Sequence, residues 1–299
     1  MKRFLAKLGL FIFVLFVVDR AFGVIFTYMG NHAKGGYVGH HKNVTDNLNE
    51  DILIFGSSRA IHHYNPLIIS DSLGMSCYNC GQDGNGIILF YGLWQMIKLH
   101  HIPKVIIYDV TPDFDVKEGD ANQRYLGWLR SDYDRPGIKE IFSEIDSTEK
   151  YKMMSMLYRY NSKFMQNITD YVNPIFCITG NGFLPLEGNM DTMKIKHNGD
   201  NKVLVKYDSV KLRFIRKFIE ETKGVKLYFV VSPSWYGTNE DEIKPIKEMC
   251  TNNNIPFISF SNDKKYVHCN QYFSDGLHLN AKGADEFTKD LIGRLYTNL

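Results

Sequence analysis

Two serines follow a short apolar run in the stretch ILIFGSSRAIHHYNP, residues 52–66. A carboxylate and an imidazole, Asp275 and His278, lie three residues apart in FSDGLHLNAKG near the other end of the chain. An imidazole can remove the proton of a serine hydroxyl while a carboxylate fixes the tautomer of that imidazole. Ser58, His278 and Asp275 are therefore candidates for nucleophilic acyl chemistry. Ser57 is the alternative nucleophile, and Ser58 taken alone is also a common kind of turn former or helix cap.

Alternating strands and helices must position these groups. Short apolar runs without polar alternation predict buried strands at residues 52–55, 76–79, 104–110, 226–231 and 256–260. Helices are expected between them, from Asn65-Pro66 to Gly74, over 87–99 and over 281–296. This pattern predicts an α/β fold, a three-layer α/β/α sandwich with a five-stranded parallel sheet in flavodoxin-like order. Ligands of such sheets bind at the carboxyl ends of the strands, where the two serines are expected.

The N-terminus predicts a membrane anchor. Lys2, Arg3 and Lys7 precede the apolar run 8–18, and after Asp19-Arg20 the apolar character resumes to Met29. A span of roughly 20 residues can cross a bilayer, and the basic flank directs the N-terminus to the cytoplasm. We expect residues 1–29 to be an uncleaved signal anchor with the rest of the chain outside the cytoplasm. A cleaved signal peptide is the alternative, since 21–23 (Ala-Phe-Gly) offer small residues at a cleavage-like spacing.

Three further segments follow the anchor. Residues 30–50 are polar and glycine-rich and are expected to be a linker, and residues 51–299 are expected to form the catalytic domain. Within it, residues 113–205 interrupt the alternation and predict an inserted cap over the carboxyl edge of the sheet. We expect 113–137 to be irregular, 138–171 to be helical and 184–200 to be a loop. Insertions of this length usually carry function.

Composition excludes some classes of function and leaves others open. The net charge is +2, which gives no footprint for nucleic-acid binding. Aromatic residues make up 14% of the chain, which suits a carbohydrate surface or an ordinary core. The five cysteines show no disulfide framework. The CxxC of Cys77 and Cys80 lacks a second pair at zinc spacing, so buried thiols are the favoured interpretation. The remaining cysteines are Cys177, Cys250 and Cys269.

Three blocks together resemble the SGNH (GDSL-like) hydrolase superfamily, and within it a membrane-anchored envelope subgroup. They are GSS after the first strand, NCGQDG after the second and DGLHLNAKGA before the last helix. The resemblance covers the chain from about residue 51 to the end, apart from the inserted cap. It implies that Ser58 is the nucleophile, that Asp275 and His278 complete the triad, and that backbone N–H groups of Ser58 and Gly84 form the oxyanion hole. Ser57 stands where the family usually has Asp.

The third block departs from the family pattern. Where the family commonly has an Asn that donates to the oxyanion, this chain has Pro112 in the run DVTPD. Losing one such donor costs roughly 3 kcal/mol in transition-state stabilisation. Three explanations remain open: a donor from elsewhere, such as Arg59, Thr111 or the cap; an unusual acyl acceptor; or a site that only binds.

Other polar and aromatic residues are weaker candidates. Asp109, Asp113 and Asp115 could suggest a metal, but a solvated acidic turn is the favoured interpretation, and we expect no metal site. One of His62 and His63 could face the pocket, although a surface position is favoured for both. Trp235 and Tyr236, in SPSWYG, are candidates for a sugar subsite, with core or loop packing as the alternative.

The candidate triad predicts ester hydrolysis or acyl transfer, and the resemblance implies that it acts on O-acetyl groups of a cell-envelope polysaccharide. We expect no cofactor, a partnership with the membrane through the N-terminal helix, and an acylated glycan or other small ester as substrate. No nucleic-acid partner is expected, and the sequence points to no protein partner. The rival hypothesis is an accessory or glycan-binding protein that kept the scaffold without the activity. Pro112 favours the rival, and Ser58, Asp275 and His278 oppose it.

Overall fold

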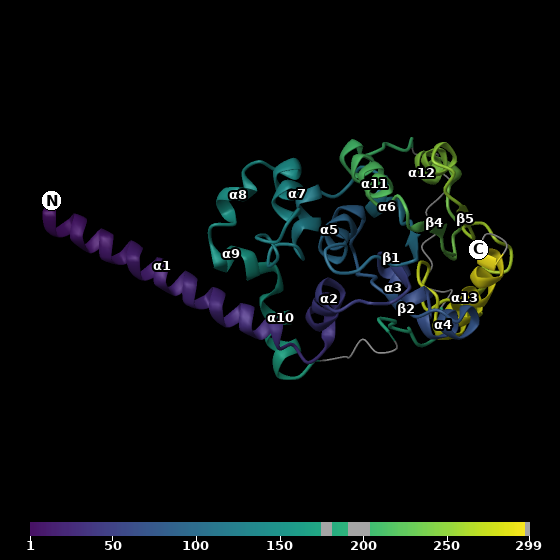
Figure 1. Ribbon diagram of the computed structural model, residues 1–299, viewed down its shortest axis with the longest axis horizontal. Coiled ribbons are helices and arrows are strands. Elements are labelled where there is room, and N and C mark those ends of the chain that lie inside the picture. The colour runs from purple at the N-terminus through teal and green to yellow at the C-terminus, as the bar shows by residue number, and fades with distance from the viewer. Residues whose placement is uncertain (175–180, 191–203, 297–299) are drawn as a thin grey trace. The chain divides into compact units, whose positions relative to one another are not determined.

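A parallel five-stranded sheet organises the larger part of the chain (Figure 1). The computed structural model describes residues 1–174, 181–190 and 204–296. All neighbouring strands pair in parallel, and their order is β2-β1-β3-β4-β5. The strands are β1 (Ile52–Gly56), β2 (Cys77–Asn79), β3 (Val105–Asp109), β4 (Lys226–Val231) and β5 (Phe257–Ser259). The predicted fold class and the flavodoxin-like order are confirmed.

Helices cover both faces of the sheet, which explains the uninterrupted apolar runs of its strands. On one face, Phe55 of β1 contacts Phe90 and Phe218, which belong to α5 (Ile87–Ile97) and α11 (Ser209–Glu221). On the other face, Ile54 shares a buried cluster with Phe287 of α13 (Ala281–Tyr296). The helices α3 (Ser58–His63) and α4 (Pro66–Leu73) contact α13 on this side.

Local signals explain where α4 begins and ends. The Asn65 side chain accepts a hydrogen bond from the N–H of Leu67 at 3.1 Å, and Pro66 occupies the first turn. Gly74 ends the helix in the left-handed conformation, with φ of 65°. These are the N-cap, N1 and C-cap positions that the sequence predicts.

The chain forms two compact units. The first contains Met1–Asn43 and Asn122–Cys177, and the second contains Val44–Ala121 and Ile178–Leu299. Besides the elements above, the second unit has α6 (Pro112–Asp115), α12 (Glu240–Asn252) and the 3₁₀ turn Asn270–Tyr272. The first unit is helical: α1 (Lys2–Asn31), most of α2 (Gly36–Asp46), η1 (Asn122–Leu126), α7 (Ile138–Ile145), α8 (Glu149–Lys152), α9 (Met156–Tyr160), η2 (Asn161–Lys163) and α10 (Phe164–Val172).

Two expectations about the connecting segments need correction. The segment 30–50, expected as a linker, contains α2, and the segment 113–137, expected to be irregular, contains α6 and η1. The helical segment 138–171 is a series of short helices: the Asp146 side chain accepts the N–H of Thr148 where α7 ends, and the Ser155 side chain caps the start of α9. Part of the loop expected at 184–200 lies outside the described residues, as does Cys177.

The first long helix, α1, suits a membrane span. Its most apolar window has a mean hydropathy of 2.3 and is 6% buried. Within the described part of the chain, it is the one helix long and apolar enough to cross a bilayer. The predicted N-terminal span is therefore present as a helix of the required length.

Gly56 should be far more sensitive to substitution than Gly74. A Cβ at Gly56 would lie 2.8 Å from the Asp109 carbonyl oxygen and 2.9 Å from the Ala60 Cβ, and its φ is 145°. We expect Gly56→Ala to lower the free energy of unfolding by about 2–4 kcal/mol. Gly74→Ala is the matched control, because its φ is also positive but nothing lies within 4 Å of the added Cβ. It should cost about 1 kcal/mol, and equal losses in urea denaturation of the two variants would contradict the argument.

Candidate active site

The turn between β1 and α3 presents Ser58. Ser57 is extended (φ −73°, ψ −151°) and fully buried, and Ser58 opens the helix with a half-buried side chain. The N–H of Ser58 lies at the first helical position, where no intrahelical acceptor exists. Among the residues that the structure describes, no acceptor for this N–H is found. Ser58 therefore offers both a hydroxyl and a backbone donor at one point.

Ser58, His278 and Asp275 form a hydrogen-bonded chain. His278 Nε2 lies 2.8 Å from Ser58 Oγ, and His278 Nδ1 lies 2.9 and 3.0 Å from the two carboxylate oxygens of Asp275. A carboxylate accepts only, so Nδ1 carries the proton and Nε2 is free to accept that of the serine. This is the arrangement that serine catalysis requires: a hydroxyl bonded to an imidazole base, and a carboxylate that orients the imidazole from its other side.

The Asp275 carboxylate is held in its ionised form. Partial burial alone would raise the pKa of Asp275, but hydrogen bonds from the His278 ring and from the N–H groups of Leu277 and His278 outweigh it. They lower the pKa to about 2. The two N–H groups lie 2.8 and 2.9 Å from Oδ1. Residues 275–278 therefore form a tight turn that is stabilised by hydrogen bonds to the Asp275 carboxylate.

Ser57 is engaged elsewhere. Its hydroxyl lies 2.7 Å from the Thr111 hydroxyl, and its side chain is fully buried. The contact ties the end of β1 to the residue that follows Val110 after β3. Ser57 therefore has the position of a structural turn residue, and Ser58 is the serine that faces the imidazole.

Both neighbouring histidines are buried, so the surface position favoured from the sequence is wrong. His62 and His63 are 6% and 0% exposed, and their ring centroids lie 5.6 and 6.3 Å from that of His278. Burial alone would lower the pKa of His62, but Asp83, whose Oδ1 lies 3.3 Å from Nε2, the Leu184 carbonyl and the Asp275 charge together raise it. His62 Nδ1 donates to the Leu184 carbonyl at 2.6 Å.

His63 supports the loop that carries His278. Its Nε2 accepts the N–H of Leu279 at 3.0 Å, so its proton lies on Nδ1, 3.1 Å from Ser232 Oγ. Complete burial lowers the pKa of His63 well below 6.5, and the nearby His278 and Arg59 add to this effect. A neutral His63 is what the Leu279 hydrogen bond needs, since a protonated ring has no acceptor.

Arg59 is not available to a substrate, contrary to the expectation. Its side chain is 6% exposed, and Nε lies 3.7 Å from Oδ2 of the fully buried Asp109. The guanidinium also donates to the carbonyl oxygens of Val110 and Ser232. These partners direct Arg59 into the interior, beneath the ends of β3 and β4.

The acidic cluster after β3 is only partly a solvated turn. Asp109 and Asp115 are fully buried, whereas Asp113 is exposed and pairs with Lys117 at 2.7 Å. Burial raises the pKa of Asp115 to about 6 against hydrogen bonds from Thr111 N–H, Tyr108 and Ile87 N–H. Each buried carboxylate thus satisfies backbone or hydroxyl donors. Within the described residues, no group of three His, Cys, Asp or Glu side chains could hold a metal ion.

The loop after β2 is hydrogen-bonded to α3 and to the residue that follows it. The Asn79 amide donates to the carbonyl oxygens of Ala60 and Tyr64 at 2.7 and 3.0 Å, and its Oδ1 accepts the N–H of Gly81 at 2.9 Å. Gly84, the predicted oxyanion donor, follows in the left-handed conformation with φ of 65°. Cys77 and Cys80 are buried free thiols, in agreement with the favoured interpretation.

Trp235 and Tyr236 have different environments. Trp235 is 8% exposed and donates its indole N–H to Asn270 at 2.7 Å, so it is a packing residue and the sugar-subsite expectation does not hold for it. Tyr236 is 51% exposed, and its ring covers Gly276, where a Cβ would approach Cε2 to 2.3 Å. Tyr236 therefore flanks the turn that carries Asp275 and His278.

Comparisons with known proteins add little to this geometry. No protein-family model and no curated protein matches the chain. One solved structure, described as that of "a putative platelet activating factor from Streptococcus pneumonia", aligns with a TM-score of 0.42 and 12% identity. The alignment covers 97% of this chain and 99% of that chain. At this TM-score the similarity assigns no function to the site.

His63 should make the protein less stable in acid. The pKa of His63 is lower in the folded than in the unfolded chain. The contribution of neutral His63 to the free energy of unfolding is therefore fully present above pH 6.5 and is lost as the pH falls below 6.5. His63→Gln keeps an acceptor for Leu279 without a titrating group. Between pH 7.5 and 5 we expect the wild type to lose up to about 2 kcal/mol more unfolding free energy than His63→Gln in urea titrations. His62 contributes equally in both proteins, and parallel pH profiles would contradict the assignment.

Proposed function

We propose that the chain is a serine esterase or O-acyltransferase of the SGNH type. The single observation that carries the proposal is the 2.8 Å contact between Ser58 Oγ and His278 Nε2, with Asp275 on the opposite side of the ring. The placement of the three blocks at the carboxyl edge of a parallel sheet supports it. The low pKa of Asp275 supports it further, because an ionised carboxylate stabilises the imidazolium that forms during attack.

The reaction proceeds in two halves. His278 Nε2 removes the proton of Ser58 as Oγ attacks the acyl carbon, and the resulting imidazolium returns that proton to the leaving alkoxide. This step breaks the ester bond and leaves an acyl-serine. A water molecule or a sugar hydroxyl then loses its proton to His278 and attacks the acyl-serine, which releases Ser58 with its proton restored. The two acceptors lead to hydrolysis and transfer, respectively.

The oxyanion is stabilised by backbone donors in this proposal. The N–H of Ser58 is one donor, and the resemblance assigns the other to Gly84. Arg59 cannot replace the missing third-block Asn, because its guanidinium is buried on Asp109 and two carbonyls. Of the side chains considered from the sequence, Thr111 remains, half-buried and in contact with Ser57. Two or three donors at this point are worth several powers of ten in rate.

An exposed rim suits a large substrate. Asp275 is 57% exposed, Leu277 54% and Tyr236 51%. A tyrosine ring beside an open site provides a flat surface of the kind that sugar rings stack on. We therefore propose O-acetyl or similar acyl esters of a cell-envelope polysaccharide as the substrate class. The basic flank of α1 supports a location of the catalytic unit outside the cytoplasm.

Pro112 favours a second candidate function. This buried proline occupies the place of the third oxyanion donor, so the site could bind an acylated glycan without turning it over. The protein would then be an accessory factor of envelope polysaccharide synthesis. The two functions differ in whether Ser58 is reactive.

A fluorophosphonate probe tests the reactivity of Ser58. We expect labelling of the full-length protein that Ser58→Ala abolishes and that Ser57→Ala retains, because the Ser57 hydroxyl is buried on Thr111. Labelled peptide mass spectrometry identifies the serine. Folded protein that is not labelled, or labelling unaffected by Ser58→Ala, would favour the binding function.

Asp275 should matter for rate more than for folding. Asp275→Asn cannot stabilise the imidazolium and favours the wrong tautomer, so we expect hydrolysis of p-nitrophenyl acetate to fall by about 10⁴-fold. The amide oxygen can still accept the N–H groups of Leu277 and His278, so the melting temperature should change little. Ser274→Ala, in the same loop, is the control, because its hydroxyl binds the Glu187 carbonyl and faces no catalytic group. A rate unchanged by Asp275→Asn would contradict the triad.

A further inference from the structure

The exposure of α1 changes along its length. Residues 1–18 are exposed throughout, and those from Phe4 to Val18 are almost all apolar. From Asp19 onward one face of the helix is covered, and Gly23 and Phe26 are buried. A bilayer span of roughly 20 residues counted from Phe4 ends near Gly23. The first packed turn of α1 is therefore expected at the surface of the membrane.

Asp19 fixes the short helix α9 at this level of α1. Its carboxylate accepts hydrogen bonds from the Ser155 hydroxyl at 2.7 Å and from the N–H groups of Met156 and Leu157 at 3.0 Å. Arg20 donates to the Met154 carbonyl. The helix N-terminus and the carboxylate satisfy one another, so this junction is a built contact within the first unit.

Apolar side chains remain exposed beside this junction. Met154 is 70% exposed, Met165 63%, Leu157 42% and Phe164 37%. They lie on the segment from α8 to α10, next to the part of α1 that leaves the bilayer. Phe164 stacks on Phe22 of α1 with ring centroids 5.8 Å apart, so these side chains adjoin the candidate membrane span, and the bilayer is the surface that suits them.

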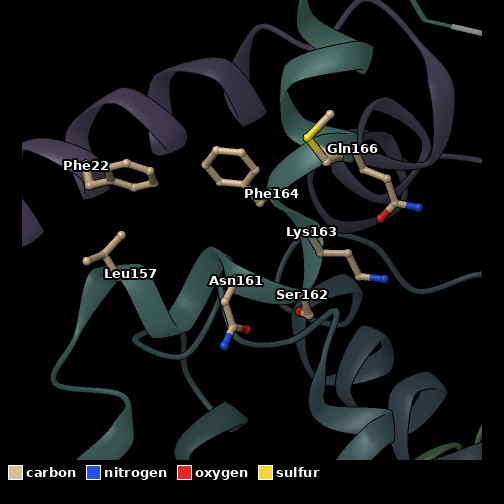
Figure 2. A pocket seen from close by; sticks show the side chains of 8 residues that line it. Phe22, Leu157, Asn161, Ser162, Lys163, Phe164 and Gln166 are labelled. Atoms are coloured by element: carbon tan, nitrogen blue, oxygen red, sulfur yellow. The ribbon is translucent and has the colours of Figure 1, made fainter.

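A pocket of about 760 Å³ opens among these residues (Figure 2). We call it the α1–α10 groove. Figure 2 shows apolar side chains toward one end of it and polar side chains toward the other. The lining residues are Phe22, Leu157, Asn161, Ser162, Lys163, Phe164, Met165 and Gln166. The groove is thus amphipathic, with its apolar end built on α1 itself.

Lys163 brings a positive charge to the polar end. Its ammonium lies 3.6 Å from the centre of the Trp128 ring, and burial lowers the pKa of Lys163 to about 8. In the described ranges no carboxylate forms an ion pair with this lysine. A half-buried cation without an anionic partner is costly, and an anionic ligand relieves that cost.

We propose that the α1–α10 groove binds one anionic phospholipid of the surrounding membrane. The phosphate lies against Lys163, with hydrogen bonds from Asn161, Ser162 or Gln166. An acyl chain runs along Phe22, Leu157 and Phe164 toward the exposed part of α1. The proposal is independent of the activity of Ser58, because all of these residues belong to the first unit.

Native mass spectrometry of the full chain, released from nanodiscs of equal parts phosphatidylcholine and phosphatidylglycerol, tests this site. We expect one phosphatidylglycerol to be retained in preference to phosphatidylcholine. Lys163→Gln should reduce its retention by about tenfold, the ratio that corresponds to one lost charge contact. Lys163→Arg should restore it. Equal retention of the two lipids by the wild type would overturn the proposal.

Two controls separate the groove from general charge and from folding. Lys150→Gln removes an equal charge from α8, at an exposed position outside the groove, and should leave retention unchanged. Leu157→Asn should weaken retention of the lipid, and soluble glycerophosphoglycerol should fail to compete because it has no acyl chain. Equal effects of Lys150→Gln and Lys163→Gln, or effective competition by the soluble headgroup, would contradict a lipid site. Circular dichroism in detergent verifies that each variant keeps its helical content.

Discussion

The buried carboxylate of Asp109 is the constraint on which the candidate active site depends. It lies at the end of the central strand β3, is fully buried, and burial raises its pKa against the nearby Arg59 charge and the hydrogen bonds that it accepts. The Tyr64 hydroxyl donates a hydrogen bond to Oδ1 at 2.6 Å, and the N–H of Ser232 donates a second one to the same oxygen at 2.9 Å. A buried carboxylate must collect donors. Here the donors to Oδ1 come from the segment after α3 and from the end of β4, so these two hydrogen bonds align both with β3.

This alignment continues to the candidate active site. Ser232, held by Asp109, faces His63, and His63 accepts the N–H of Leu279, the residue after His278. Ser58 and His63 are the first and last residues of α3, so one short helix carries the candidate nucleophile at one end and supports the loop of His278 at the other. The loop that brings His278 to within 2.8 Å of Ser58 is therefore supported by a buried polar network, and His63 is the histidine that belongs to it.

The first unit follows a different principle. Its helices other than α1 and α2 are short, its apolar side chains are incompletely covered, and α1 is exposed for its first eighteen residues. An apolar helix that is bare in water is stable in lipid, because its backbone groups are satisfied internally. The proposed lipid site would give the exposed side chains of α8 to α10 and the Lys163 ammonium a common environment, because apolar and anionic groups lie a few ångströms apart at a membrane surface.

Sequence reasoning succeeded where the signal is local or periodic. Apolar runs, the caps of α4 and the length of α1 follow from neighbouring residues, so the strand positions and the bounds of α4, α5 and α13 could be predicted closely. It failed for Arg59, His62, His63 and Trp235, because burial is decided by residues far away in the chain. Arg59 meets Asp109 fifty residues later, and Trp235 meets Asn270. No pattern around a residue tells whether a distant partner will satisfy its polar atoms.

The sequence by itself therefore determined the layered α/β architecture, the anchor-like helix and the three residues Ser58, Asp275 and His278 as candidates. Their types and their places beside strand ends and a terminal helix were enough for that. Only the tertiary structure decided that Ser58 and not Ser57 faces the imidazole, because the choice depends on a turn that points one hydroxyl at Thr111 and the other at His278. It also decided that the histidines and Arg59 support the site from within, since a buried ion or ring can be recognised only when all of its neighbours are present.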